Sequence, residues 1–252
     1  YLVFTLWMFV ADLVALNPHK AFWSNYERMD GWVTMVHTFF FFVVSSSLLS
    51  VTNLWRKWWL TFLGGSALVC GYGLLQIMDV FATHQGGRID ATFGNAAYLP
   101  AYLLFGIAVA FWQGMISKGW LRYGLFTLAC VEVSILLFTA TRGALFGLVG
   151  ASIVGALLWF FTSEQKKGKR VALGVILGIA LLGLVFFAIR DTALVHTSPT
   201  LSRLSSVFSL SQELSVRAEI WPIAYQGFLA RPLTGYGHEG FNYVFNTFYS
   251  PA

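Results

Sequence analysis

Seven long apolar runs constrain the fold of this chain more than any other feature. A membrane-spanning helix needs about 20 consecutive, mainly apolar residues, and each run approaches that length. The runs are too long for strands and lack the alternation of a membrane β-barrel. Backbone polar groups must be satisfied within a bilayer, so we predict helices and an all-α polytopic membrane protein. The predicted spans are residues 1–17, 31–51, 57–78, 97–116, 120–140, 143–162 and 171–190.

The composition supports a membrane protein and argues against two other classes. Hydrophobic residues make up 57% of the chain and charged residues 11%, whereas a soluble domain has about 25% charged residues. The net charge of +5 comes from residues clustered at the ends of the runs, not from a basic helix with interleaved aromatics. We therefore expect membrane lipid, and no nucleic acid, as a partner. The five histidines are scattered, and Cys70 and Cys130 fall inside apolar runs as predicted core residues, so no metal site or cofactor is predicted.

Charges in the short loops predict the orientation of the chain. One side carries eight Lys and Arg residues and the other carries four. By the positive-inside rule the first side is cytoplasmic. The extracytoplasmic side then holds the loops 18–30 and 79–96, the corner at Arg142 and the tail 191–252, together with eight of the eleven acidic residues. The cytoplasmic set is Arg56, Lys57, Lys118, Arg122, Lys166, Lys167, Lys169 and Arg170.

The tail is predicted to be a large, partly helical extracytoplasmic loop beside the 1–190 transmembrane domain. A connection of this length indicates function rather than linkage. Apolar residues recur at helical spacing between Glu213 and Ala230, and Pro222 is expected to kink or restart that helix. The segment from Arg231 to Gly237 has turn-forming residues that should end it.

Arg142 is the strongest functional candidate. It lies between two apolar runs where the chain must reverse, and a deep, unpaired arginine costs roughly 2.5–3.5 kcal/mol. Its small neighbours leave space for a ligand, although it could simply snorkel to the interface. Arg217, in the tail, is predicted to lie on the same side and to be held against Trp221 one turn later; a solvated helix face with Glu219 nearby is the plainer interpretation. Two arginines converging on one face suggest a site for a polyanionic, lipid-linked substrate.

Further polar residues are candidates of lower rank. Arg88, Asp90 and Asn95 bring a cation, a carboxylate and an amide to the same predicted face, within a loop that could also be structural. Asp12 and Glu132 lie inside predicted spans, where carboxylates are expensive and often functional. Glu132, near mid-span, is expected to pair with another helix.

Several of these segments together resemble the O-antigen ligase and polymerase superfamily. The similarity covers roughly residues 80–252 through short motifs in a characteristic order. Each motif alone is only moderately specific, and their order and shared side make the match stronger. They are Arg88-Ile-Asp-Ala-Thr-Phe-Gly-Asn95 with Tyr98, Thr139-Ala-Thr-Arg-Gly-Ala-Leu145, Arg217-Ala-Glu-Ile-Trp221 and Arg231-Pro-Leu-Thr-Gly-Tyr-Gly237 with Phe241.

The resemblance implies a GT-C-like membrane glycosyltransferase of the bacterial inner membrane, with its active side in the periplasm. Such enzymes transfer a glycan from undecaprenyl pyrophosphate with inversion and are thought to need no metal. A ligase passes the glycan to lipid A–core. The resemblance places Arg142 and Arg217 on the leaving pyrophosphate as catalytic residues, and it implies substrate binding by Arg88, Asn95, Trp221, Glu219 and His238.

Two departures from the family pattern affect the expected activity. The family's tail usually carries a further histidine, for which His238, in the turn after the helix, is a poor substitute. The chain begins at Tyr1 without a methionine and ends in polar sequence, so we expect an internal fragment that is inactive alone.

The leading hypothesis is therefore an O-antigen ligase, and four alternatives remain. A surface-polysaccharide polymerase or a protein O-oligosaccharyltransferase would use the same chemistry. An anionic-solute transporter should show charged or Gly/Pro-broken helices near mid-membrane and paired halves, whereas here the polar residues concentrate on one face and no second half mirrors the first. A non-catalytic membrane scaffold would leave the arginines without a purpose.

Overall fold

The computed structural model describes residues 1–25, 29–84, 86–192, 195, 197, 202, 205 and 211–250, and for residues 211–216 it describes the backbone only. The described residues are mostly helical and contain no β-strand. The chain divides into two compact units, one made of Tyr1–Trp55 with Leu210–Ala252 and the other of Arg56–Ser209. The all-α polytopic architecture predicted from the sequence is confirmed.

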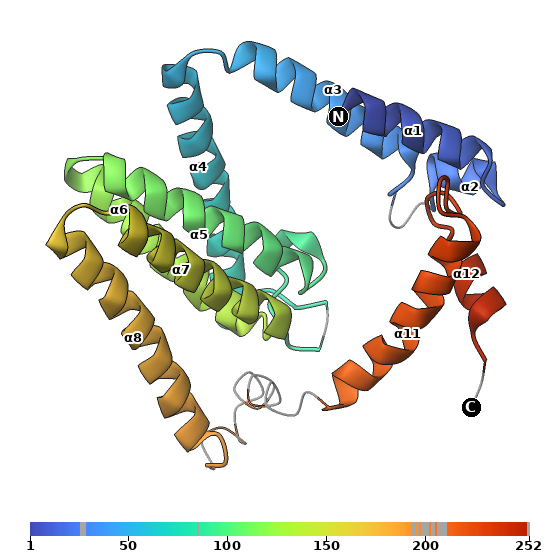
Figure 1. The fold of residues 1–252 in the computed structure, drawn as a ribbon. Coiled ribbons are helices and arrows are strands. Elements are labelled where there is room, and N and C mark those ends of the chain that lie inside the picture. Colours follow the sequence, from blue (N-terminus) through green and yellow to red (C-terminus); the bar gives the residue numbers. More distant parts are fainter. Residues whose placement is uncertain are drawn as a thin grey trace. The chain divides into compact units, whose positions relative to one another are not determined.

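The second unit consists mainly of long apolar helices (Figure 1). After α4 a short 3₁₀ helix, η1 (Ala91–Phe93), leads into α5. In the part of the chain that the structure describes, five helices are long and apolar enough to cross a membrane. They are α4 (Thr52–Ile77, whose first turn belongs to the first unit), α5 (Tyr98–Ile116), α6 (Gly119–Phe138), α7 (Arg142–Thr162) and α8 (Lys166–Ile189).

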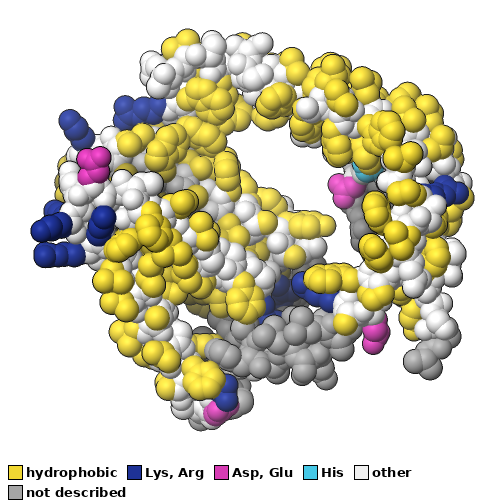
Figure 2. All heavy atoms as spheres, viewed as in Figure 1, with side chains coloured by type: hydrophobic (Ala, Val, Ile, Leu, Met, Phe, Trp, Pro, Cys, Tyr) yellow, Lys and Arg dark blue, Asp and Glu magenta, His cyan; other side chains and the backbone are white. Residues whose placement is uncertain are grey.

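Packing in the second unit is centred on α5 and α6, which form a hairpin through a two-residue connection. Leu99 and Leu103 of α5 and Ile135 and Leu136 of α6 are almost completely buried and form one core cluster with Cys70 of α4. Apolar side chains also cover the outward faces of these helices (Figure 2). Because lipid is as apolar as a protein interior, such outward faces suit a bilayer.

A buried polar contact joins α4 to α6 inside this apolar unit. The Ser66 hydroxyl donates a hydrogen bond to Glu132 Oε1, and both side chains are fully buried. Gly106 of α5 faces the pair, since a Cβ there would lie 2.5 Å from Glu132 Oε1. The expected pairing of Glu132 with another helix is confirmed.

Cys130 corrects one prediction from the sequence. Cys70 is buried as expected, but Cys130 is exposed. Both cysteines fall in apolar runs, yet Cys130 lies on the face of α6 turned away from the buried positions Ala129, Glu132 and Leu136. In a membrane helix an apolar run does not reveal which face is buried, because the lipid face is apolar too.

The first unit contains shorter helices. α1 (Leu2–Leu13) and α3 (Trp32–Leu48) have 12 and 17 residues and lie where the first two spans were predicted. Between them is α2 (Pro18–Trp23), which begins with the Asn17 side chain accepting a hydrogen bond from the Lys20 N–H at 3.0 Å. The seven-span count and the membrane boundaries stay predictions.

The tail contributes two helices to the first unit. The predicted helix is present as α11 (Ser211–Ala230), and it runs without a restart through Pro222. A turn segment, residues 231–240, then leads to α12 (Phe241–Phe248), which packs on α11. Of the two expected effects of Pro222, a restart is therefore wrong, and a kink stays a prediction.

Candidate functional site

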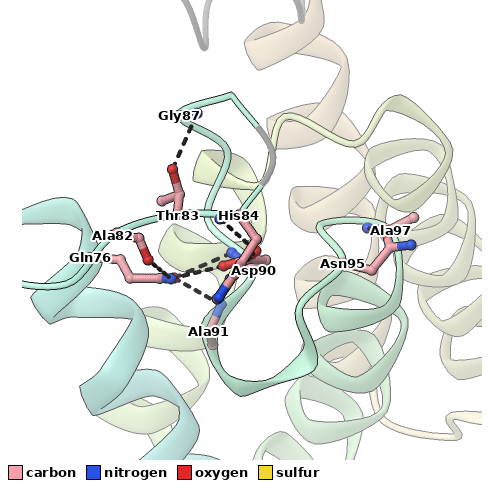
Figure 3. Close-up of polar contacts among 9 residues, drawn as sticks. All are labelled: Gln76, Ala82, Thr83, His84, Gly87, Asp90, Ala91, Asn95 and Ala97. Atoms are coloured by element: carbon pink, nitrogen blue, oxygen red, sulfur yellow. Dashed lines mark hydrogen bonds and ion pairs between the residues drawn. The ribbon is translucent and has the colours of Figure 1, made fainter. Parts of the chain in front are cut away.

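The loop between α4 and α5 is built around the buried carboxylate of Asp90 (Figure 3). Gln76, at the end of α4, donates through Nε2 to Asp90 Oδ1 at 2.8 Å and to the Ala82 carbonyl at 3.0 Å. Its Oε1 accepts hydrogen bonds from the N–H groups of Asp90 and Ala91. Asp90 Oδ2 accepts from the His84 N–H at 3.0 Å and from His84 Nδ1 at 2.9 Å. Asp90 thus holds the two ends of the loop together.

These contacts determine the acidity of Asp90. Burial alone raises its pKa, but hydrogen bonds from Gln76 and His84 to the charged form outweigh burial. The net result is a pKa below the ordinary 3.8. A carboxyl whose folded pKa is depressed stabilises the protein above its unfolded pKa, and this contribution is lost as the pH falls through the folded value.

Asp90→Asn is accordingly expected to lower the thermal unfolding temperature at neutral pH. The new amide N–H₂ would face a hydrogen-bond donor of Gln76 or His84, so a buried hydrogen bond would be lost. The difference from the wild-type protein should stay nearly constant above about pH 5. It should shrink as the pH falls through 3.8 and then through the lower pKa of the folded protein, where the buried carboxyl becomes protonated. Thermal unfolding across that range measures it. Asp79→Asn, an exposed carboxylate in the same loop, is the control; an equal loss in both variants would contradict the role of Asp90.

Arg88 binds the corner between α6 and α7. Its Nε donates to the Thr139 carbonyl at 3.0 Å and one terminal nitrogen donates to Thr141 Oγ1 at 2.8 Å. The Thr141 hydroxyl in turn donates to the Ala96 carbonyl at 2.7 Å. Arg88 therefore connects the loop before α5 to the corner that precedes Arg142. These contacts give Arg88 a positioning role, and its predicted contact with substrate stays a prediction.

Arg142 is the first residue of α7 and is half-buried. The chain turns into the helix through Ala140, whose φ of 50° is in the left-handed region. Thr141 does not cap the helix with its side chain, because its hydroxyl is engaged by Arg88 and Ala96. Gly143 faces open space, while Ala140 and Ala144 are buried. The Arg142 side chain thus extends from the N-terminus of α7, where backbone N–H groups and the helix dipole favour binding of an anion.

Asn95 serves the local backbone. Its Oδ1 accepts a hydrogen bond from the Ala97 N–H at 2.8 Å, and its carbonyl accepts from the N–H of Tyr98, the first residue of α5. This contact shapes the entry into α5, and the predicted role of Asn95 in substrate binding stays a prediction.

Three of the predicted site residues of the tail lie on α11 in the first unit. Arg217, Glu219 and Trp221 are all exposed, and Trp221 has 67% of its surface accessible. Between Arg217 and Trp221, both described and both exposed, no cation–π contact is present. The expected stacking is therefore wrong. The convergence of Arg217 with Arg142, which belongs to the other unit, stays a prediction.

His238 has a partner that the sequence did not suggest. Its Nδ1 lies 2.6 Å from Asp12 Oδ2, and its N–H donates to Asp12 Oδ1 at 2.8 Å. Asp12, on α1, is 1% exposed. Nearby, Glu239 accepts from Ser24 Oγ at 3.4 Å and lies 3.9 Å from Lys20 Nζ. The turn segment of the tail is therefore fastened to α1 and α2.

Asp12 is the functional candidate that sequence reasoning underrated. A carboxylate within an apolar run signals a special role, but its partner is 226 residues away. Among the described residues, no group of three or more His, Cys, Asp or Glu side chains could hold a metal ion.

Comparison with known proteins identifies the family. A family model described as O-antigen ligase matches residues 125–251, just over half of the chain. The match includes Arg142, Arg217 and the 231–237 segment. The chain belongs to the O-antigen ligase family, which is a class of multi-pass bacterial membrane proteins. No curated protein and no solved structure matches it.

Proposed function

We propose that this protein transfers a polysaccharide from undecaprenyl pyrophosphate to lipid A–core at the periplasmic face of the inner membrane. The observation that carries the proposal is the family match over both arginine segments. Family membership favours a glycan-transferring enzyme over a transporter or a scaffold.

The proposed chemistry follows from the groups at the corner. The acceptor hydroxyl attacks the anomeric carbon of the donor from the face opposite the pyrophosphate, and its proton passes to water. The anomeric C–O bond breaks, its electron pair goes to the pyrophosphate oxygen, and the configuration inverts. Negative charge on the leaving group grows during this step, so cations that bind it lower the barrier.

Arg142 is suited to this role by its position. It extends from the N-terminus of α7 at a corner held by the Arg88 and Thr141 contacts. A guanidinium can bind phosphate oxygens through two parallel hydrogen bonds. We assign Arg217 to the same pyrophosphate, with Glu219, Trp221, Asn95 and His238 near the glycan.

The test of the function uses the full-length protein in two bacterial hosts, one lacking its O-antigen ligase and the other lacking its O-antigen polymerase. Lipopolysaccharide gels are compared with those of the empty vector. A long-chain ladder restored in the ligase-deficient host supports the proposal. A ladder restored only in the polymerase-deficient host assigns the polymerase reaction instead. If neither host regains a ladder, both the ligase and the polymerase reactions are rejected.

A further inference from the structure

The first unit contains a shallow cavity, open at the surface, that none of the proposed roles of the arginines uses. It has a volume of about 250 Å³ and lies beside the start of α1, the first half of α3 and the turn segment at His238. Its polar lining includes Asp30, Thr34, Thr38 and His238, with Tyr1 on one wall. Polar side chains on membrane helices usually face the protein interior or a water-filled cavity because lipid exposure is costly.

His238 is oriented by the buried carboxylate of Asp12. A carboxylate can only accept hydrogen bonds, so the contact at 2.6 Å places a proton on Nδ1. In the neutral ring, the other nitrogen, Nε2, is then a hydrogen-bond acceptor. The second hydrogen bond, from the His238 N–H to Asp12 Oδ1, also fixes the backbone of His238 beside the same carboxylate.

The two threonines of the cavity also present acceptors. Thr34 donates its hydroxyl proton to the Met29 carbonyl, and Thr38 donates to the Thr34 carbonyl at 2.9 Å. With their protons engaged, both oxygens have lone pairs for a ligand. Asp30 is an exposed carboxylate, which adds acceptors and negative charge.

Because the cavity lining is rich in hydrogen-bond acceptors, it favours ligands that donate hydrogen bonds. Phosphate carries only acceptors and negative charge, and it would be repelled by Asp30. A ligand with several O–H donors is complementary. Tyr1 adds an aromatic wall, since its ring stacks on Phe39 with centroids 5.6 Å apart. The volume is below the roughly 300–1,000 Å³ of a site for a drug-sized ligand, so it suits one ring rather than a long chain.

We propose that this cavity binds a sugar ring of one of the two glycan substrates through its hydroxyl groups, with His238 held in place by Asp12. The proposal rests on the proposed transfer function and adds to it a subsite whose lining does not include the arginines assigned to the pyrophosphate. The donor and the acceptor glycan both carry such hydroxyl groups, and the KM measured for each substrate distinguishes them.

The test measures initial rates with the purified full-length enzyme in lipid vesicles, varying the undecaprenyl-pyrophosphate-linked glycan and lipid A–core separately. The double variant Thr34→Val, Thr38→Val removes two acceptor oxygens without changing side-chain shape. We expect about a tenfold rise in KM for one glycan, with kcat nearly unchanged. The substrate whose KM rises is the occupant of the cavity.

Two variants control for folding. Thr247→Val removes a comparable exposed hydroxyl that also donates to a carbonyl four residues earlier, and it should leave both KM values unchanged. Thr34→Val, Thr38→Ser returns one of the two hydroxyls, so its KM should lie between those of the double variant and the wild-type protein. Unchanged KM values in the double variant, with transfer still dependent on Arg142, would overturn the subsite and leave the proposed function standing.

A binding measurement covers the case in which no transfer is seen. Saturation-transfer NMR is recorded with free core oligosaccharide and with free O-antigen repeat oligosaccharide. We expect signals from one of them with the wild-type protein and a marked loss with the double variant. Equal signals from both proteins, or none from the wild-type protein, would overturn the subsite.

Discussion

Replacing Arg142 with alanine is expected to lower kcat for glycan transfer about 10²–10³-fold, the usual loss when one preorganised donor to a developing anion is removed. KM for the donor should change far less, because the contact strengthens as charge builds on the leaving pyrophosphate. Arg142→Lys keeps the charge and loses the bidentate geometry, so an intermediate rate is expected. Initial rates with the full-length enzyme in vesicles measure both variants.

Arg122→Ala is the matched control, since this arginine is exposed on α6 at the predicted cytoplasmic side. It should retain nearly the wild-type rate. An Arg142→Ala enzyme that also retained the wild-type rate would remove Arg142 from the reaction.

The same assay tests whether the two units bring their arginines to one pyrophosphate. Arg217→Ala alone should cause a loss similar to that of Arg142→Ala. If both contact the same group, the double variant should lose much less than the product of the two single effects. Strictly multiplicative losses would instead indicate two independent sites.

Gly237→Ala is expected to detach the turn segment of the tail from α1. Gly237 has a φ of 77°, which is costly for alanine, and a Cβ there would lie 2.6 Å from the Ala15 Cβ and 3.0 Å from Asp12 Oδ1. Left-handed strain of roughly 1–2 kcal/mol and overpacking of about 1–3 kcal/mol act together. Thermal unfolding of the purified protein should show a clear loss of stability, and limited proteolysis should cut within residues 231–240 sooner.

Gly235→Ala separates the two causes. Gly235 has a φ of 61° but faces open space, so alanine there adds left-handed strain without a clash. Its loss of stability should be smaller than that of Gly237→Ala. Equal losses would mean that backbone strain alone matters and that the contact with Asp12 contributes little.

The helices and their family could be predicted from local sequence. Apolar runs of bilayer length predict helices wherever they occur, because a backbone in lipid has few other ways to satisfy its hydrogen bonds. The position of Arg142 at a reversal between two such runs likewise followed from spacing alone, and α7 begins at that residue. The short motifs around Arg142 and Arg217 resembled the family that the comparison then identified.

The side-chain partnerships could not be predicted, because they join residues far apart in the chain. Arg88 binds Thr141 across 53 positions, and Asp12 binds His238 across 226. The exposure of Cys130 on α6 could not be predicted either, since lipid-facing and buried positions are both apolar. In this protein the sequence by itself determined the helical, membrane-embedded class, because that depends on the hydrophobicity of contiguous segments. Only the tertiary structure decided which polar groups meet, because each such pair depends on how helices pack in three dimensions.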